Sequence, residues 1–538
     1  MPRPHSTLPA WQALRSHREQ VRSLRVRDLF GADPRRFAQL SREAAELLLD
    51  FSRQRVQPET MLMPSLTFAD PWLAPGDVVT RHDIEMLADA GVIKGPITQW
   101  PIPWPDIARD VNGFEQLEEL TSGEHSALNR LRRTARAMMR TNELQGHVRV
   151  AGASKPDQIR GFADTPREDG EAEGGVTWTG KYLAFRAQAT AVADADDDKT
   201  WRPDGSYIGA TIGNVMLSGG YMDRWWGPGW DGSLILSSSA RPIPTLSVER
   251  NYSDPFSVPV LKWLGPWRAS IGFGALESHR EDFDHTRIFE ARVTFKPWKH
   301  LEIGLSRTAL LCGEGRPCDL GTFWDMFTGN DNDQDPSQQP GDQLAGYDLR
   351  FSSPWRHVPF ALYGQMIGED EAGALPSKFL GLFGIEHWAS VGSGSYRIRV
   401  EYSDTACDFS RQVPQFDCAY ESGIYTVGYR FRGRSIGHSV DSDSRLTTVG
   451  ALYVSPSSAS WELVARDAKL NRDATTVPET AQTLAPLAAD VESIDLFYRH
   501  DLLGGRLVAG AGFESREASS LSSRDDEWRV MAQWVREF

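Results

Sequence analysis

From about residue 176 onward, apolar and polar residues alternate with a period of two. Phe289, Ala291 and Val293 are separated by Glu290 and Arg292, and the same alternation recurs in 183–190, 396–402, 425–431 and 494–498. A period of two places alternate side chains on opposite faces of a β-strand. The pattern therefore predicts a mainly β protein with a long series of strands over residues 176–538.

The polar positions of these expected strands are mostly arginine, glutamate and aspartate. A soluble sandwich also alternates, but its polar face is open to bulk water. A transmembrane antiparallel β-barrel has apolar residues facing lipid and polar residues facing a hydrated lumen. At roughly 20 residues per strand and connection, the region predicts about 18 strands. The alternating end 528–538, which finishes on Phe538, resembles the signal read by outer-membrane assembly machinery.

Residues 70–145 have a helical pattern instead. Thr80 and Asp83 form a start like a capping box, Gly91 is expected to end that helix, and a short helix is expected over 106–111. Leu128, Leu131 and further apolar residues at helical spacing predict a longer helix. The acidic, glycine-rich stretch 164–175 is expected to be a flexible connector.

Residues 1–61 are also expected to be helical, with Ser41 capping a helix over the following leucines. The segments Pro9–Leu14, Leu24–Phe30, Ala32–Pro34 and Leu47–Arg55 resemble the N-terminal edge of glucose-6-phosphate isomerase. The resemblance covers about a tenth of the chain, and nothing after Met61 matches the catalytic Glu, His and Lys of that enzyme. We therefore expect this segment to carry no active site and to reflect a fusion or a gene-model join.

The start of the chain does not resemble a signal peptide, because Met1 is followed by polar residues instead of an apolar segment. Residues 61–69, by contrast, resemble the end of one, with Thr67 and Ala69 placed as at a cleavage site. The hypothesis is that the join replaced the front of a signal peptide.

The composition restricts the partners and the compartment. A net charge of −15 and a pI near 5.4 argue against a nucleic-acid partner. The four cysteines fall into two local pairs, Cys312 with Cys318 and Cys407 with Cys418, in polar stretches rich in turns. We expect two small loop disulfides and an oxidising compartment, with four free thiols as the alternative.

Several blocks, in this order, resemble the capsule assembly Wzi family over about 71–538. They are Tyr221–Ser237, Ala240–Pro244, Gly313–Pro317, Asp342–Asp348, Tyr363–Gly373 and Glu401–Thr405. The resemblance implies an outer-membrane barrel of 18 strands with a periplasmic helical bundle, placed here at 70–145. It also implies a lectin without catalytic residues that binds and anchors capsular polysaccharide. The implied partners are capsular polysaccharide, outer-membrane lipid and capsule export machinery.

Within these blocks, two groups of residues are candidates for binding polysaccharide or lining the lumen. Trp225 and Trp226 have faces that can stack on sugars, and carboxylates and guanidinium groups can bind hydroxyls. In the alternative structural interpretation, the two tryptophans belong to an interfacial girdle and Arg224 is paired inside the lumen. The full candidate set is Asp223, Arg224, Trp225, Trp226, Arg241, Glu369, Asp370 and Glu371.

Other chemistry finds little support in the sequence. Glu369, Asp370 and Glu371 suggest glycoside cleavage, but that reaction needs two carboxyls at a fixed separation, and a lumen or loop cluster is the simpler interpretation. The acidic stretches 194–198 and 331–335 lack the glycine and the distal glutamate of an EF-hand loop. We expect no metal, no cofactor and no catalytic residue.

Two other functions compete with the lectin. A saccharide-conducting outer-membrane porin would share the barrel pattern but would pass a large current. Glucose-6-phosphate isomerase activity is suggested by the N-terminal fragment alone. A soluble secreted β-protein is a further alternative to the membrane barrel.

Overall fold

The computed structural model describes residues 41–44, 47–50, 70–138, 142–328, 341–372, 375–473, 483–518 and 523–538. The chain forms two compact units, Met1–Thr67 and Phe68–Phe538. In the first unit, β1 (Ser41–Ala44) and β2 (Leu47–Asp50) pair as an antiparallel hairpin. The helix expected after Ser41 is therefore wrong for these residues. Short helices need tertiary packing to be stable, so helix propensity alone does not determine the secondary structure of this segment. The other expectations for residues 1–69 lie outside the described residues.

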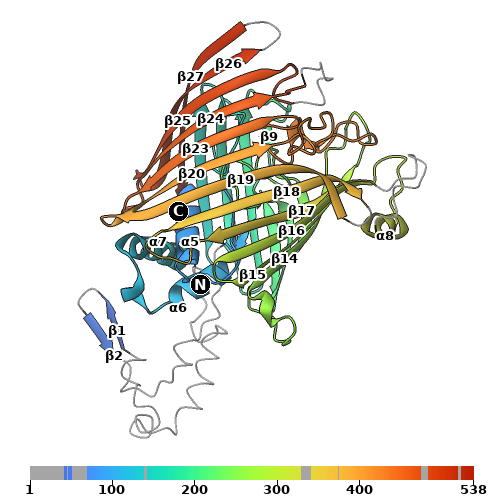
Figure 1. The fold of residues 1–538 in the computed structure, drawn as a ribbon. Coiled ribbons are helices and arrows are strands. Elements are labelled where there is room, and N and C mark those ends of the chain that lie inside the picture. Colours follow the sequence, from blue (N-terminus) through green and yellow to red (C-terminus); the bar gives the residue numbers. More distant parts are fainter. Residues whose placement is uncertain are drawn as a thin grey trace, which may run out of the picture. The chain divides into compact units, whose positions relative to one another are not determined.

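In the second unit, eighteen antiparallel strands of the described chain form the wall of a closed barrel (Figure 1), which confirms the predicted fold class and strand number. The strands are β6 (Leu144–Ala153), β7 (Gly170–Thr179), β8 (Leu183–Ala193), β10 (Tyr207–Ile212), β11 (Val215–Tyr221), β13 (Pro244–Arg250), β14 (Trp267–Ala275), β15 (Arg287–Trp298), β16 (Leu301–Leu311), β17 (Gly341–Ser352), β18 (Phe360–Ala372), β19 (Leu375–Val391), β20 (Gly394–Asp404), β23 (Arg445–Val454), β24 (Ser460–Leu470), β25 (Ala489–Leu502), β26 (Gly505–Ala518) and β27 (Ser523–Glu537).

Two pairings close the barrel. The C-terminal strand β27 pairs with β6, so that Trp534 lies opposite Val150. On the other side of β6 and β7, β8 pairs with β10, and the short β9 (Trp201–Arg202) adds to the end of β8. Because every wall strand has a partner on both sides, the backbone hydrogen bonds of the wall are made within the sheet, as a membrane requires.

The barrel begins earlier than residue 176, which corrects the expected domain boundary. Strand β6 lies wholly before residue 176, and β7 begins before it and ends after it. The connector expected over 164–175 is therefore strand from Gly170 onward. The outward positions of β7 include Gly170, Ala172 and Gly174, which give no hydrophobic signal. The small size of these side chains hid the strand from the alternation pattern.

The two faces of the wall differ as the alternation predicted. In β14, Ile271 and Phe273 point outward and are 56% and 42% exposed, whereas Arg268 and Ser270 are buried inside the barrel. The same division holds along β25, where Ile494 and Leu496 are exposed and Asp495 is buried. The apolar side chains therefore cover the outside, and the charged side chains meet inside.

In the described residues, three α-helices precede the wall: α5 (Val78–Asp89), α6 (Trp104–Gly113) and α7 (Ser122–Met138). They fall in the segment expected to be a helical bundle. The cap of α5 is Asp77, whose Oδ1 accepts a hydrogen bond from the Val79 backbone N–H at 3.0 Å, so the helix starts before the expected Thr80. No helix of the described residues is long and apolar enough to span a membrane.

The two ends of the barrel have different connections. At one end the strands are joined by short turns such as 299–300, 392–393 and 503–504, and the C-terminus lies there as well. Helix α7 contacts this end, where the Gly123 backbone N–H donates to Ser390 Oγ at 3.0 Å and Ser126 Oγ donates to the Ser393 carbonyl at 2.7 Å. The long connections 154–169, 222–243 and 405–444, and the described part of another, 312–328, lie at the other end.

The segment 425–431, expected to be a barrel strand, is instead part of a long connection. Only the short β21 (Arg430–Phe431) is strand, and it pairs with β22 (Arg434–Ser435). Gly428 has a φ of +74°, a left-handed conformation that interrupts an extended chain. Tyr425 and Tyr429 belong to this connection, and their side chains are buried instead of facing lipid.

Candidate functional site

The lumen of the barrel is filled by a plug, which consists of α5 and residues 222–243. Ten of the twelve residues of α5 are buried, on all sides of the helix. Arg350 of β17 holds its C-terminal end: its Nη1 and Nη2 donate to the two carboxylate oxygens of Asp89 at 2.7 and 2.8 Å. Arg397 of β20 lies 3.0 Å from Glu85. The helix is therefore bound to the wall by buried ion pairs.

The second part of the plug is held by the same side of the wall, through β18 and β20. Trp230 and Asp231 donate their backbone N–H groups to the Glu401 carboxylate at 2.8 and 3.1 Å. The Leu234 backbone N–H donates to Gln365 Oε1 at 2.7 Å. Arg81 of α5 lies over the ring of Trp230 at 4.2 Å from its centroid, which joins the two parts of the plug.

Trp225 and Trp226 form β12 of the plug, which pairs with the neighbouring strand β4 (Gln99–Trp100). Their side chains are 0% and 1% exposed. They form neither a lipid-facing girdle nor an accessible platform for sugars, and both of those interpretations are wrong for this pair. Arg224 lies 3.2 Å from Glu290 inside the lumen, as the structural alternative predicted.

Arg241 is placed in an ion-pair cluster at the end with the long connections. Its Nε and Nη2 donate to the Asp204 carboxylate at 2.7 and 2.8 Å, and it also pairs with Asp197. Asp197 is in turn 2.9 Å from Arg202. Asp197 therefore pairs with arginines, whereas Asp194, Asp196 and Asp198 of the same acidic stretch are exposed.

The three consecutive acids lie in β18, not in a loop. Glu369 faces the lumen beneath the long connection that carries Tyr420. Asp370 and Glu371 are the next residues of the same strand, and their side chains lie outside the described part of the structure. Among the described residues, no contact joins Glu369 to Asp223 or Arg241.

A cavity of about 320 Å³ lies between the plug and the wall formed by β6, β7, β8 and β10. Its lining includes the aromatic residues Trp72, Phe162 and Tyr207, and Trp72 meets Tyr207 edge to face at 5.2 Å between ring centroids. Five arginines and seven carboxylates complete it: Arg149, Arg160, Arg167, Arg186, Arg202, Asp70, Asp164, Glu171, Glu173, Asp204, Asp223 and Glu537. Its volume is at the lower end of the range for small-molecule sites.

Polar groups in this cavity have unused hydrogen-bonding capacity. Arg149 Nε is enclosed and makes no hydrogen bond to the described residues, although its Nη1 and Nη2 donate to Glu171 and Gln533. Arg160 donates to the carbonyls of Thr165, Pro166 and Ser238, and the described residues provide it with no ion pair. A ligand with oxygen atoms could satisfy these donors.

Asp223, of the predicted set, lines this cavity and lies 3.5 Å from Arg167. Its enclosure away from bulk water raises the pKa of Asp223 to about 6. Arg167 opposes the shift, and Asp164 and Asp204 add to it. The charge of Asp223 therefore changes within a mildly acidic range of pH.

The sequence interpretation missed the other cavity residues. Arg149, Glu171, Glu173 and Arg186 occupy inward positions of β6, β7 and β8, which could have been identified had β6 and β7 been recognised as strands. Trp72 lies far from them in sequence, and no sequence pattern connects it to the cavity. The position of the cavity follows from the closure of β27 on β6.

Both predicted disulfides are confirmed. Cys312 and Cys318 are bonded with a Cα–Cα separation of 4.8 Å, and Cys407 and Cys418 with one of 5.9 Å. Both lie in long connections at the same end of the barrel. In one of these connections, Tyr420 and Tyr429 donate their hydroxyls to the plug carbonyls of Leu234 and Ile235 at 2.8 and 2.9 Å. Residues 405–444 therefore cover the plug at this end.

This architecture is similar to that of known proteins. The solved structure described as Wzi, an outer-membrane protein involved in group 1 capsule assembly in Escherichia coli and a carbohydrate-binding β-barrel, has a TM-score of 0.76 at 26% identity. That match covers 87% of this chain and 99% of the other. An uncharacterized 55.8 kDa protein in the cps region of Klebsiella pneumoniae is 32% identical over 344 residues, which are 63% of this chain and 66% of that protein.

The resemblance to glucose-6-phosphate isomerase covers a minor part of this chain, 10% in one match and 26% in another, to the enzyme of Deinococcus radiodurans. Glucose-6-phosphate isomerase of Dechloromonas aromatica is 53% identical over 55 residues, 10% of this chain and 10% of the enzyme. The chain thus spans about a tenth of that enzyme's length.

The family model described as capsule assembly protein Wzi matches residues 139–528, which include all eighteen wall strands in whole or in part. The recognition made from the sequence blocks is confirmed, and the barrel is an outer-membrane protein. The chain belongs to the capsule assembly protein Wzi family.

Proposed function

We propose that this protein binds capsular polysaccharide and anchors it at the cell surface, using the luminal cavity as a saccharide site. The observation that carries the proposal is a cavity that combines aromatic residues, carboxylates and incompletely paired arginines inside a plugged barrel of this family. Sugars present hydroxyls to polar groups and C–H surfaces to aromatic rings.

The plug favours a barrel that retains polysaccharide over a porin that conducts saccharides. An open barrel of this strand number would hold an aqueous channel, but α5 and residues 222–243 occupy this lumen and are tied to its wall by buried ion pairs. A polymer bound weakly at many barrels is held strongly through multivalency. Each cavity therefore needs only modest affinity for anchoring.

The orientation belongs to the same proposal. The end with short turns and the C-terminus lies in the periplasm, so that α6 and α7 form the periplasmic bundle and face the capsule export machinery. The disulfide-bearing connections lie outside the cell. Outer-membrane lipid contacts the exposed apolar face between the two ends.

Substitution of two cavity residues is expected to weaken saccharide binding. Arg167→Gln and Arg186→Gln each remove a cation of the cavity that can bind a hydroxyl or a carboxylate, so each should raise the Kd by about tenfold, the lower limit for a charge-assisted hydrogen bond. The measurement is isothermal titration of the full chain in detergent with fragments of capsular polysaccharide. Asp254→Asn, on an exposed residue outside the cavity, is the control. Unchanged affinity in both cavity variants would place the site elsewhere.

Binding of an acidic polysaccharide is expected to strengthen as the pH falls from 7.5 to 5. Asp223 is ionised above its pKa of about 6 and repels a polymer carboxylate. Protonation removes a repulsion on the order of 1 kcal/mol, about fivefold in Kd. The raised pKa of Asp223 also favours the folded state at low pH, an advantage lost as the pH rises through 6. Folding is therefore checked at each pH.

The controls for this titration use the same protein. Asp223→Asn should bind the acidic polymer with little dependence on pH, and a neutral polymer should show the same lack of dependence with the unsubstituted chain. If the Asp223→Asn variant keeps the full pH dependence, another group is responsible.

A further inference from the structure

Helix α8 (Leu320–Thr328) and the Cys312–Cys318 loop lie against the outside of the barrel wall. Phe289, Ala309 and Leu311 occupy outward positions of β15 and β16, yet they are 7%, 0% and 6% exposed. Phe323 of α8 covers them and meets Phe289 edge to face at 5.3 Å. Farther along the same strands, outward Val293 and Leu305 are 42% and 50% exposed.

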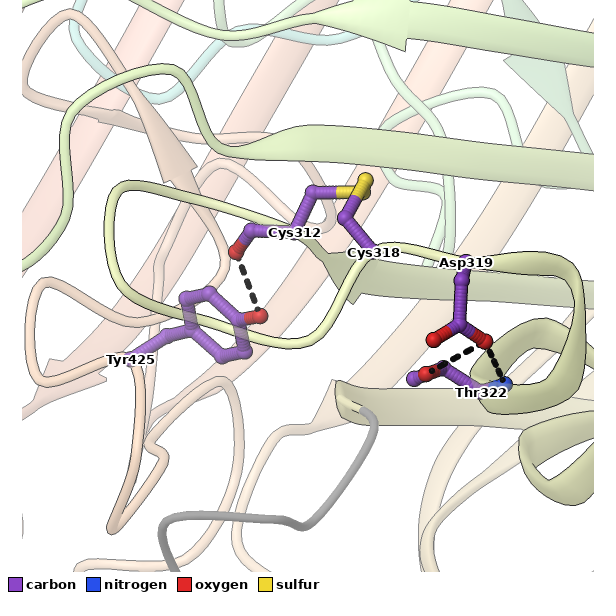
Figure 2. Close-up of a disulfide and its surroundings, with 5 residues drawn as sticks. All are labelled: Cys312, Cys318, Asp319, Thr322 and Tyr425. Atoms are coloured by element: carbon purple, nitrogen blue, oxygen red, sulfur yellow. Dashed lines mark hydrogen bonds between the residues drawn. A yellow bond between two sulfur atoms is a disulfide. The ribbon is translucent and has the colours of Figure 1, made fainter.

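The loop and the start of the helix are fixed by local bonds, which Figure 2 shows. The disulfide closes the loop at the end of β16, and the Tyr425 hydroxyl donates to the Cys312 carbonyl at 2.8 Å. Asp319 Oδ1 accepts hydrogen bonds from the Thr322 backbone N–H at 2.9 Å and from its hydroxyl at 3.2 Å. The helix is therefore anchored at the rim of the barrel.

Between the helix, the disulfide and the wall lies a cavity of about 300 Å³. Most of its lining is apolar: Phe273, Leu311, Pro317, Leu320, Phe323 and the disulfide. Asp319 and Thr322, which bond to each other, are the polar side chains of the lining. Such a cavity suits a hydrocarbon chain better than a sugar.

The cavity continues the surface that faces lipid. Phe273 lines it from β14 while remaining 42% exposed on the outward face, and its neighbour across the strand pair, Leu246, is 72% exposed. Leu320 and Trp324 of α8 are 87% and 63% exposed. Apolar exposure of this kind at the rim of a membrane barrel is typical of contact with the lipid interface.

A cation lies beside the cavity. Arg287, the first residue of β15, faces outward and pairs in register with Leu311, which lines the cavity. No ion pair of Arg287 is found among the described residues. Side chains opposite each other across a strand pair lie roughly 5 Å apart at Cβ. An apolar pocket with an arginine at its rim matches an anionic lipid.

We propose that this pocket binds one acyl chain of an outer-leaflet membrane lipid, with the anionic headgroup of that lipid on Arg287. The disulfide loop and α8 form a clasp that holds the chain against Phe273 and Leu311. The site depends on the barrel lying in the outer membrane, and it is independent of saccharide binding in the lumen.

The test is photocrosslinking of the full chain in nanodiscs that contain phosphatidylglycerol with a diazirine on its acyl chain, followed by mass spectrometry. Crosslinks are expected to concentrate on Leu320, Phe323 and Phe273 over the outward residues Ile494 and Leu496. An even distribution over all outward residues overturns the proposal, because it describes bulk lipid contact.

Two disulfide variants separate the clasp from general destabilisation. Cys312→Ser with Cys318→Ser should abolish the concentration of crosslinks at α8, whereas Cys407→Ser with Cys418→Ser, at the same end of the barrel, should preserve it. Heat-modifiable gel mobility identifies the folded protein. Equal crosslinking at α8 in both folded variants overturns the role of the clasp.

Selectivity for the lipid headgroup tests the proposed lipid site even if a disulfide variant does not fold. Arg287→Gln is expected to lower the preference for phosphatidylglycerol over phosphatidylcholine by about fivefold, the contribution of one arginine near an anionic lipid surface. Arg524→Gln, an exposed arginine of β27, is the matched control. An unchanged preference in Arg287→Gln removes the headgroup assignment.

Discussion

Replacing Arg350 by alanine is expected to lower the free energy of unfolding by about 3–5 kcal/mol, the cost of breaking a buried ion pair by removing one partner. Arg350 bridges the plug and the wall, since it bonds to Asp89 of α5 and also donates to Glu386 of β19 at 2.6 Å. All three side chains are at most 6% exposed. The substitution would leave two buried carboxylates without their common cation.

Denaturant unfolding in detergent, followed by tryptophan fluorescence, measures this loss. Adding Asp89→Asn to Arg350→Ala should recover part of the stability, because Glu386 keeps its ion pair with Arg397, whereas Asp89 is left without one among the described residues. Arg524→Ala, which breaks the exposed pair with Asp526, is the control and should leave stability unchanged. A loss below about 1 kcal/mol would place the pair among weak surface contacts.

The same variant tests the plug by an independent measurement. If α5 detaches from the wall when Arg350 is removed, an aqueous path opens through a barrel wide enough for a channel. The unsubstituted chain should pass little current across a planar bilayer, and Arg350→Ala should pass more. A large steady current through the unsubstituted chain would favour the porin alternative.

The alternation of residues predicted the wall well where outward side chains are large. In β14 and β25 the pattern is clear, because Ile271, Phe273, Ile494 and Leu496 stand against charged or small inward neighbours. It failed in β7, where glycine and alanine face outward. It misled at 425–431, where Tyr429 is buried and donates to the plug, and Tyr425 is buried and donates to the Cys312 carbonyl.

The plug and the cavity could not be predicted by periodicity, because both depend on contacts between distant residues. Arg149 Nη2 donates to Gln533 across 384 positions of sequence, and Trp72 Nε1 donates to Glu249 across 177. The Trp225–Trp226 block is the clearest case, since its composition suggests a sugar platform and its position within the plug buries it. Asp223, two residues earlier, is the member of that block that lines the cavity.

Replacing Ile494 by arginine is expected to destabilise the protein in a bilayer by about 2–4 kcal/mol, the cost of a cation on the lipid-facing surface near the membrane midplane. Ile494 lies in the middle of β25, points outward and is 48% exposed. In an apolar surrounding the guanidinium loses its hydration without gaining a partner. The measurement is urea-dependent unfolding from phospholipid vesicles, with gel mobility separating folded and unfolded forms.

The size of the destabilisation distinguishes the membrane barrel from a soluble one. If the outward face met water, an exposed isoleucine could be replaced by arginine with a change within about 0.5 kcal/mol, as at ordinary surface positions. Val413→Arg, in the connection 405–444 and 77% exposed, is the matched control and should show that small change. Equal effects at Ile494 and Val413 would contradict the assignment of the outward face to lipid. A loss confined to Ile494 would establish it, because the two substitutions differ in the medium that surrounds the new charge.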